Sequence, residues 1–508
     1  MRNSDRDNKY TASPKLVLTT RTEGAGTGFD DVRNRSLQLL CALTISCLPL
    51  AERAGASEVP ISPGAPLLAH EDGVDPCPIG PPPVPLSLLE AVSRSLCGNP
   101  KTRGAWASIK LAAASVQQGR EGFLPDLAIT GKELKSSTQT RINHDRLLDT
   151  SSNALYPQGE LSLTWVLFDF GGRSAQLASA RDLLAAARAN LDLNLQQVFL
   201  RAAADYFDAQ AAQASLASAR EIVTITGRSV DAAHLRVQRG AAPVSDELQA
   251  RTANAQAVVN RVKADAELRS KRGALALDMG FDPDTPLTLP AASADVTPGS
   301  AFSESLHDLM EQAKRTHPSV VVAERQLAAA RADERAARAR GYPVVSLVGE
   351  MLRSNEPLTP NLGSPSVPGS VTTKSIGIQL SVPISDPLWK RGLIARTRAQ
   401  VGVQEQTLFE AQQQVAQDVW NAYSALEAGT ENLSSSQTLL ESAAQSFESA
   451  RRRYEGGVGN ILELLSSQGA YASAQQQRIQ ALSDWRVARL ALGASLGQLG
   501  PADAEKLP

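Results

Sequence analysis

The hydrophobic positions of this chain follow two different periods, and each period occurs in both halves. Leu, Val and Ile recur every seven residues in two long segments, 172–240 and 391–457. This spacing predicts long helices that pack along a seam, each about 100 Å long. Apolar and polar residues instead alternate in four short segments, 124–134, 159–168, 343–352 and 375–384. Such alternation predicts strands with one apolar face.

The second half of the chain repeats the first at an offset of 217 residues. A repeat this long indicates a duplicated domain half and not a solenoid. The matching residues are Leu177 with Ile394, Leu184 with Val401, Leu191 with Leu408, Val198 with Val415, Tyr206 with Tyr423, Gly240 with Gly457, Val244 with Ile461, Leu248 with Leu465, and Gly280 with Gly497.

Each half is predicted to contain the same elements in the same order. A short helix (86–96 and 305–315) is followed by a break at Asn99-Pro100 or His317-Pro318, because proline disfavours helix at the preceding residue. A second helix follows, then two strands around a polar loop (137–157 and 355–374), the long helix, a glycine turn, and a returning helix that is shorter or broken near its middle. We therefore divide the chain into a leader and signal peptide (1–56), a Pro-rich linker (57–85), repeat one (86–290), repeat two (291–498) and a tail (499–508).

The N-terminal region predicts export from the cytoplasm. Arg33 and Arg35 precede an apolar run over 37–50, and Ala54-Gly55-Ala56 resembles a cleavage site. The run is too short to span a bilayer as a helix. A lipid anchor at Cys47 is the weaker alternative, because Thr44 stands where an aliphatic residue is expected. The leader is longer than a signal needs, so translation could start further downstream.

Two cysteines, Cys77 and Cys97, follow the predicted cleavage site. In an oxidising periplasm they could form a disulfide. Two unpaired thiols are the open alternative, since Cys77 lies in the Pro-rich linker.

Composition excludes several functional classes. The formal net charge is −2, with both signs interspersed, so no nucleic-acid-binding surface is indicated. The five histidines are scattered without metal-ligand spacing and are interpreted as surface residues. The sequence has no phosphate-binding glycine loop, catalytic triad order or cysteine cluster. We expect no metal, no cofactor and no enzymatic activity.

Aromatic residues are scarce, at 4%, yet several fall where a strand meets a helix. Such residues favour membrane–water interfaces, so we interpret them as one girdle of a transmembrane barrel. The alternative is that bulky side chains fill a domain boundary. The residues are Phe123, Phe168, Phe170, Tyr342 and Trp389.

The predicted fold is mainly α with a small β-barrel part. Four strands cannot close a barrel, and open strand edges cannot face lipid. Oligomerisation is therefore required if the strands lie in a membrane, and three chains would supply twelve strands, an even number that such barrels have. The long helical hairpins of the same three chains would form a periplasmic tunnel.

The chain resembles the TolC-like outer-membrane efflux and secretion channels over residues 86 to about 498. The resemblance rests on the Asn-Pro break, on Gly-Phe-Leu-Pro and Gly-Tyr-Pro before the first strand of each repeat, on Leu-Ser-Val-Pro-Ile from Leu380, and on the turn that begins at Arg453-Tyr454. It implies a homotrimeric exit duct with no cofactor. The duct would be recruited by a periplasmic adaptor and an inner-membrane transporter, either ATP-driven (ABC) or proton-driven.

The resemblance also implies roles for individual residues at the periplasmic tip. Gly240 and Gly457 would form the turns that an adaptor contacts, although ending a helix is all that their structure requires. Asp246 and Tyr454 match a latch that holds the tip closed. The basic member of that latch is replaced by Gly459, and Arg452, Arg453 or Arg239 could substitute. Asp246 could instead only stabilise a helix N-terminus.

Glu463 matches a ring of acidic side chains at the pore constriction, and Ser466 stands where a second acid is common. Three copies of Glu463 would favour cations. A solvated helix face is the alternative interpretation of this residue.

We therefore predict an export duct in the outer membrane of a Gram-negative bacterium, extending into the periplasm. Type I protein (toxin) secretion is favoured over small-molecule efflux, because the lipid-anchor signal is poor. A soluble periplasmic coiled-coil adaptor or spacer is the alternative from another class. It would explain the long helices, but not the duplicated strand pairs.

Overall fold

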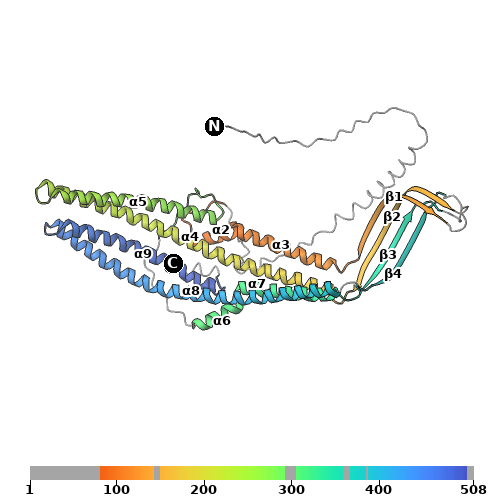
Figure 1. Cartoon of the computed structure of the whole chain (residues 1–508). Coiled ribbons are helices and arrows are strands. Elements are labelled where there is room, and N and C mark those ends of the chain that lie inside the picture. Colours follow the sequence, from red (N-terminus) through yellow and green to blue (C-terminus); the bar gives the residue numbers. More distant parts are fainter. Residues whose placement is uncertain (1–79, 142–148, 292–304, 359–366, 385–386, 500–508) are drawn as a thin grey trace, which may run out of the picture. The chain divides into compact units, whose positions relative to one another are not determined.

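The computed structural model describes residues 80–141, 149–291, 305–358, 367–384 and 387–499. All of them lie in one compact unit, Ala65–Pro508. The elements described there are labelled in Figure 1. In chain order they are α2 (Leu88–Gly98), α3 (Pro100–Glu121), β1 (Asp126–Thr140), β2 (Thr150–Phe168), α4 (Gly172–Gln238), α5 (Val244–Asp278), α6 (Leu306–Thr316), α7 (Pro318–Ala339), β3 (Val344–Ser354), β4 (Val371–Ser381), α8 (Pro387–Glu455) and α9 (Ile461–Ser495).

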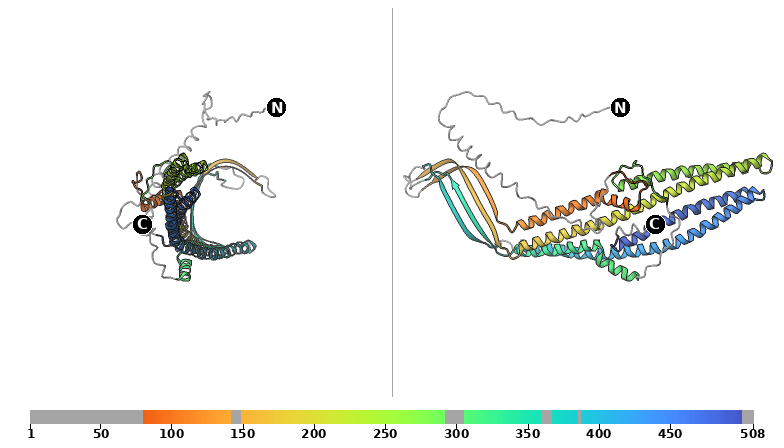
Figure 2. Two further views of the ribbon diagram at one scale, coloured as in Figure 1. Left: turned by 90° about the vertical axis from the view of Figure 1, so that its left-hand side faces the viewer. Right: turned by 180° about the vertical axis from the view of Figure 1, so that it is seen from behind.

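The duplicated, mainly helical fold is confirmed. The two long helices, α4 and α8, have 67 and 69 residues, and the returning helices, α5 and α9, have 35 residues each. The returning helices are therefore shorter and unbroken. Within this unit the four strands lie at one end of the helices, and the α4–α5 and α8–α9 turns lie at the other (Figures 1 and 2). Among the helices of the described part of the chain, none has the length and apolar content needed to cross a membrane.

The two proline breaks start the second helix of each repeat in the same way. The Asn99 side-chain oxygen accepts a hydrogen bond from the backbone N–H of Lys101 at 2.9 Å, and Pro100 follows as the first helical residue. In repeat two, His317 Nδ1 accepts from the backbone N–H of Ser319 at 3.3 Å. His317 is only 8% exposed, and burial lowers its pKa. The interpretation of every histidine as a surface residue was therefore wrong at this position.

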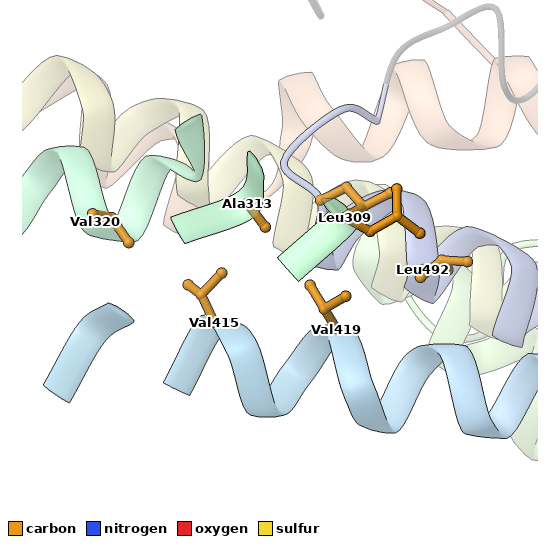
Figure 3. Close-up of a cluster of buried hydrophobic side chains, with 7 residues drawn as sticks. Leu309, Ala313, Val320, Val415, Val419 and Leu492 are labelled. Carbon is orange, nitrogen blue, oxygen red and sulfur yellow. The ribbon is translucent and has the colours of Figure 1, made fainter. Parts of the chain in front are cut away.

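The core is distributed along the helices in several small clusters. One of them joins α6 and α7 to α8 and α9, as Figure 3 shows. Each large aliphatic side chain buried there contributes about 1.5–3 kcal/mol. Val415, which the seven-residue spacing placed on the seam, lies in this cluster and is 1% exposed. The cluster consists of Leu309, Ala313, Val320, Val415, Val419, Leu492 and Leu496.

The strands form one antiparallel sheet in the order β1-β2-β3-β4. The first strand pair is longer than predicted, because β1 continues to Thr140 and β2 already begins at Thr150. The predicted loop over 137–157 is therefore wrong for most of its length, where Ser137 pairs with Asn153. Its Ser, Thr and Asn residues carry no apolar alternation, yet backbone pairing alone can extend a hairpin. In repeat two, residues 371–374 of the predicted loop belong to β4.

Candidate functional site: a sheet face and a helical tip

One face of the sheet is apolar across all four strands. Leu127 of β1 pairs with Leu163 of β2, which pairs with Gly349 of β3, which pairs with Ile376 of β4. Directly paired residues lie on the same face of a sheet. A second apolar row on this face consists of Trp165, Leu347 and Ile378. Ile376 and Ile378 are 76% and 73% exposed, so no described part of the chain covers them.

The opposite face of the sheet is more polar. One row on it contains Ser162, Glu350 and Ser375, and another ends in Gln379. The two faces therefore differ in polarity, as the lipid-facing and water-facing sides of a membrane-embedded sheet do.

The outer strands of the sheet have free edges within the described chain. β1 pairs only with β2, and β4 pairs only with β3. Their unpaired backbone groups can form hydrogen bonds with another strand. The geometry thus offers two complementary edges for further copies of the same chain.

Four of the five predicted interface aromatics gather where the strands meet the helices. The rings of Phe168 and Phe170 are 4.8 Å apart, and those of Phe170 and Tyr342 are stacked at 5.1 Å. Phe123 lies 4.9 Å from the guanidinium of Arg173. All four aromatic residues are exposed. The side chain of Trp389 lies outside the described residues.

Gly240 and Gly457 form the two turns at the tip, as their sequence positions predict. Both have a positive φ, +71° and +85°, a conformation that glycine adopts without strain. Gly459 follows the second turn, and a Cβ added there would lie 2.6 Å from the backbone nitrogen of Tyr454. The turn itself therefore excludes the basic side chain that the family resemblance places at this position.

Tyr454 lies in a small core that joins the two hairpins at the tip. This core also contains Ala233 of α4, Ala250 of α5, and Ile461 and Leu464 of α9. Tyr454 is 1% exposed, and its hydroxyl has no hydrogen-bond partner among the described residues. Burial raises the pKa of this hydroxyl, and the charges of Arg236 and Asp246 act on it in opposite directions. Asp246 is therefore near Tyr454 but is not hydrogen-bonded to it.

The basic residue that contacts Tyr454 is Arg236, which the sequence analysis missed. Its Nη1 donates to the backbone carbonyl of Tyr454 at 3.1 Å, and its guanidinium lies 4.7 Å from the centre of the ring. Arg236 stands in the last turn of α4, at the position equivalent to Arg453 in repeat two. This correspondence between Arg236 and Arg453 is the signal in the sequence that could have identified Arg236.

None of the three arginines considered from the sequence makes this contact. Arg452 pairs with Glu448 at 2.8 Å. Arg453 pairs with Glu463 at 2.7 Å. Arg239 is exposed, and its backbone N–H caps the end of α4.

The predicted constriction residue Glu463 therefore forms an ion pair within its own chain. Its carboxylate stands in the first turn of α9 and accepts a hydrogen bond from Arg453 Nη1. Glu463 and Ser466 are both exposed. The local charge at this position is an acid–base pair and not an isolated carboxylate.

Cys97 lies near the end of α2 and is disulfide-bonded. Cys77, its predicted partner, lies outside the described residues, so their pairing stays a prediction. Within the described ranges, no group of three or more His, Cys, Asp or Glu residues is arranged to hold a metal ion.

Two segments of the chain, residues 91–280 and 309–498, match the family model described as "outer membrane efflux protein". The chain belongs to this family. It is 31% identical to the protein CyaE of Bordetella pertussis over 416 residues, which are 82% of this chain and 85% of that protein. It is 22% identical over 415 residues to the outer membrane efflux protein BepC of Brucella suis, covering 81% and 86% of the two proteins.

The fold matches that of solved outer-membrane channels. The outer-membrane channel OprN superposes with a TM-score of 0.71 at 22% identity, covering 81% of this chain and 90% of that one. The family and the fold confirm the predicted resemblance and the outer-membrane localisation. The protein is an outer-membrane efflux channel of the type that serves tripartite export systems, and its family consists of transport proteins.

Proposed function

We propose that three copies of this chain assemble into the exit duct of a tripartite export system. The apolar sheet face with two free edges is the observation that carries the proposal. Lipid offers no hydrogen bonds to a free edge, so β1 of one copy pairs with β4 of the next until the sheet closes. The apolar face then contacts outer-membrane lipid, and the polar face lines a water-filled lumen. The exposed aromatics at the strand–helix junction form the inner girdle.

The helical hairpins of the three copies continue this lumen into the periplasm. Their tips carry the turns at Gly240 and Gly457, which a periplasmic adaptor grips. An inner-membrane transporter, ATP-driven or proton-driven, supplies the energy. The chain itself binds no cofactor and performs no chemistry. The long unbroken α4 and α8 support this arrangement, since about 100 Å of helix reaches far from the membrane.

A polypeptide exported by a type I system is the proposed cargo. The sequence around Cys47 supports this choice, because it lacks the aliphatic residue of a good lipid-anchor signal. The test is deletion of the gene in its own host, followed by two assays. Loss of a polypeptide from the culture medium with unchanged drug susceptibility supports secretion. Hypersensitivity to drugs with a normal set of secreted polypeptides would assign the duct to small-molecule efflux instead.

A further inference from the structure

The two repeats of one chain pack together through α4 of repeat one and α9 of repeat two. Ser218 Oγ on α4 donates a hydrogen bond to Gln475 Oε1 on α9 at 2.5 Å. Elsewhere along the same helices, Arg486 Nη1 on α9 donates to Gln210 Oε1 on α4 at 3.2 Å. These contacts define one junction between a first-repeat helix and a second-repeat helix.

The duplication supplies the same two helical faces a second time. At the offset of 217 residues, α8 is the equivalent of α4, and α5 is the equivalent of α9. Within the described chain, however, α5 packs chiefly on α4, and α8 packs chiefly on α9 and α7. The second junction is therefore not made inside one chain.

Burial differs sharply between equivalent apolar positions of the two junctions. Val244 on α5 is 61% exposed, whereas its equivalent Ile461 on α9 is 2% exposed. Trp420 on α8 is 52% exposed, whereas its equivalent Ala203 on α4 is fully buried. The α5 and α8 positions are thus the uncovered ones, which indicates contact with another molecule.

The exposed apolar residues of α5 continue along the face that is equivalent to the α4-facing side of α9. Leu248 and Val262 are both more than half exposed. Their equivalents on α9, Leu465 and Ile479, are half-buried and line the space between α9 and α4. The same face of the returning helix is therefore occupied in repeat two and open in repeat one.

The side chains of the second junction carry complementary charges. Glu427 on α8 is the equivalent of Gln210, and Arg269 on α5 is the equivalent of Arg486. Glu427 is exposed. Arg269 is also exposed, and within its own helix it pairs with Asp265 at 3.2 Å. If the two side chains are placed as their equivalents are placed, they form an ion pair between an acid and a guanidinium group.

We propose that α8 of one copy receives α5 of the next copy, in the arrangement that α4 and α9 adopt within one chain. Glu427 of the first copy then pairs with Arg269 of the second, and the exposed apolar residues of α5 are covered. The same head-to-tail contact made by every copy closes a ring. This inference rests on the proposed ring of copies, and it adds the helical surfaces and the ion pair that join them.

The strands support the same order of copies. Within one chain, β2 of repeat one pairs with β3 of repeat two. The equivalent pair between copies is β4 of one copy with β1 of the next, and these are the two free edges of the sheet in the described chain. Strands and helices therefore both join the second repeat of one copy to the first repeat of the next.

The test is cross-linking of the full-length protein in outer membranes with a short bifunctional thiol reagent. A variant that combines Glu427→Cys with Arg269→Cys should convert most of its monomer band on a denaturing gel into covalent dimer and trimer. The wild type and the two single variants should remain monomeric on the same gel.

Glu427→Cys combined with Glu267→Cys is the matched control. Glu267 is exposed and lies two residues from Arg269, but it lines the cleft between α5 and α9 of its own chain. Covalent oligomers from the first pair and none from the control pair support the junction. Equal cross-linking of both pairs, or none from a protein that light scattering shows to be trimeric, would overturn this inference and leave the proposed duct standing. Chains that do not assemble at all would overturn both.

Charge reversal measures the ion pair itself. Glu427→Arg should lower the temperature at which the trimer dissociates in detergent by several degrees, because it places two cations opposite each other. Adding Arg269→Glu to the same chain should restore most of this loss. If the losses of the two single variants simply add in the double variant, the two side chains do not meet.

Discussion

At the scale of single residues, the contact between Arg236 and Tyr454 is the strongest candidate for a restraint on the tip. It links the end of α4 to the end of α8, so separating the two hairpins must break it. Charge-assisted hydrogen bonds of this kind contribute about 1.5–3 kcal/mol. We infer that Arg236 takes the role that the sequence analysis sought in Arg239, Arg452 or Arg453.

The latch is tested by the conductance of single channels at rest. Arg236→Gln should raise the resting conductance several-fold, because the variant loses the cation above the Tyr454 ring.

Tyr454→Phe distinguishes a latch that uses the Tyr454 hydroxyl from one that uses only the ring and the backbone carbonyl, since it removes the hydroxyl alone. If Asp246 engages that hydroxyl in the assembled tip, Tyr454→Phe and Asp246→Ala should both open the channel. If Asp246→Ala lowers the Tm without changing the conductance, Asp246 only stabilises the N-terminus of α5.

If Glu463 lies at a constriction of the proposed duct, its ion pair with Arg453 predicts how the duct selects ions. Arg453→Gln should increase cation selectivity and block by cations, because it leaves three carboxylates without their partners in the trimer. Glu463→Gln should shift the selectivity toward anions, because it leaves three guanidinium groups without their partners, and the double variant should resemble the wild type. Reversal potentials in a salt gradient measure this. Identical reversal potentials in all variants would show that these residues lie away from the constriction.

A carboxylate pair between α4 and α5 predicts a dependence of stability on pH. Burial, together with the hydrogen bond and the charge of Asp278, raises the pKa of Asp205 to about 7. An unfolded aspartate titrates near pH 3.9, so the folded protein binds an extra proton between about pH 4 and 7. The stability that the folded protein gains from this proton is therefore complete below about pH 4, and it is lost as the pH rises to about 7.

Removing this titration should flatten the pH profile of the Tm. Asp205→Asn should lose less stability than the wild type between pH 5 and 8, by an amount on the order of 1–3 kcal/mol. Asp265→Asn is the control, because it removes an exposed carboxylate from α5 without touching the pair. Parallel profiles for Asp205→Asn and the wild type would contradict the assignment.

At the scale of helices and strands, hydrophobic periodicity predicted most elements. The polar composition of residues 137–157 led to the wrong ends for β1 and β2. The seven-residue spacing that includes Val198 and Val415 found both long helices, since only a helix brings such residues to one side. The extension of β1 and β2 was missed because Ser137 and its neighbours are polar on both faces. Arg236 was missed because Tyr454 is 218 positions away, and the two meet only after the hairpins pack.

An arginine placed on one face of the sheet should have a different effect from an arginine placed on the other, even when the two substituted residues are neighbours in β4. Ile378→Arg places a charge on the apolar face, at a cost of about 2–4 kcal/mol near the middle of a bilayer. It should reduce the amount of protein recovered in the outer-membrane fraction. Gln379→Arg places the same charge on the polar face and should be tolerated. Equal recovery of the two variants would mean that lipid does not contact the apolar face.

At the scale of the whole molecule, assembly follows from what one chain leaves unfinished. Within the residues that the structure describes, the sheet has two free edges and an uncovered apolar face. Large apolar side chains are also exposed along α8, among them Phe409 and Trp420. Exposed apolar surface of this extent indicates contact with lipid or with further copies. The proposed trimer would satisfy both needs, because it would close the sheet and bring six helical hairpins together.

The most direct test of the proposed duct is the conductance of the purified protein in a planar lipid bilayer, after light scattering has established its oligomeric state. We predict a trimer that opens discrete, long-lived channels, with larger conductance in Arg236→Gln than in the wild type. A protein that is folded and trimeric yet silent in both forms would contradict a water-filled duct. The helical hairpins would then be better explained as a periplasmic spacer.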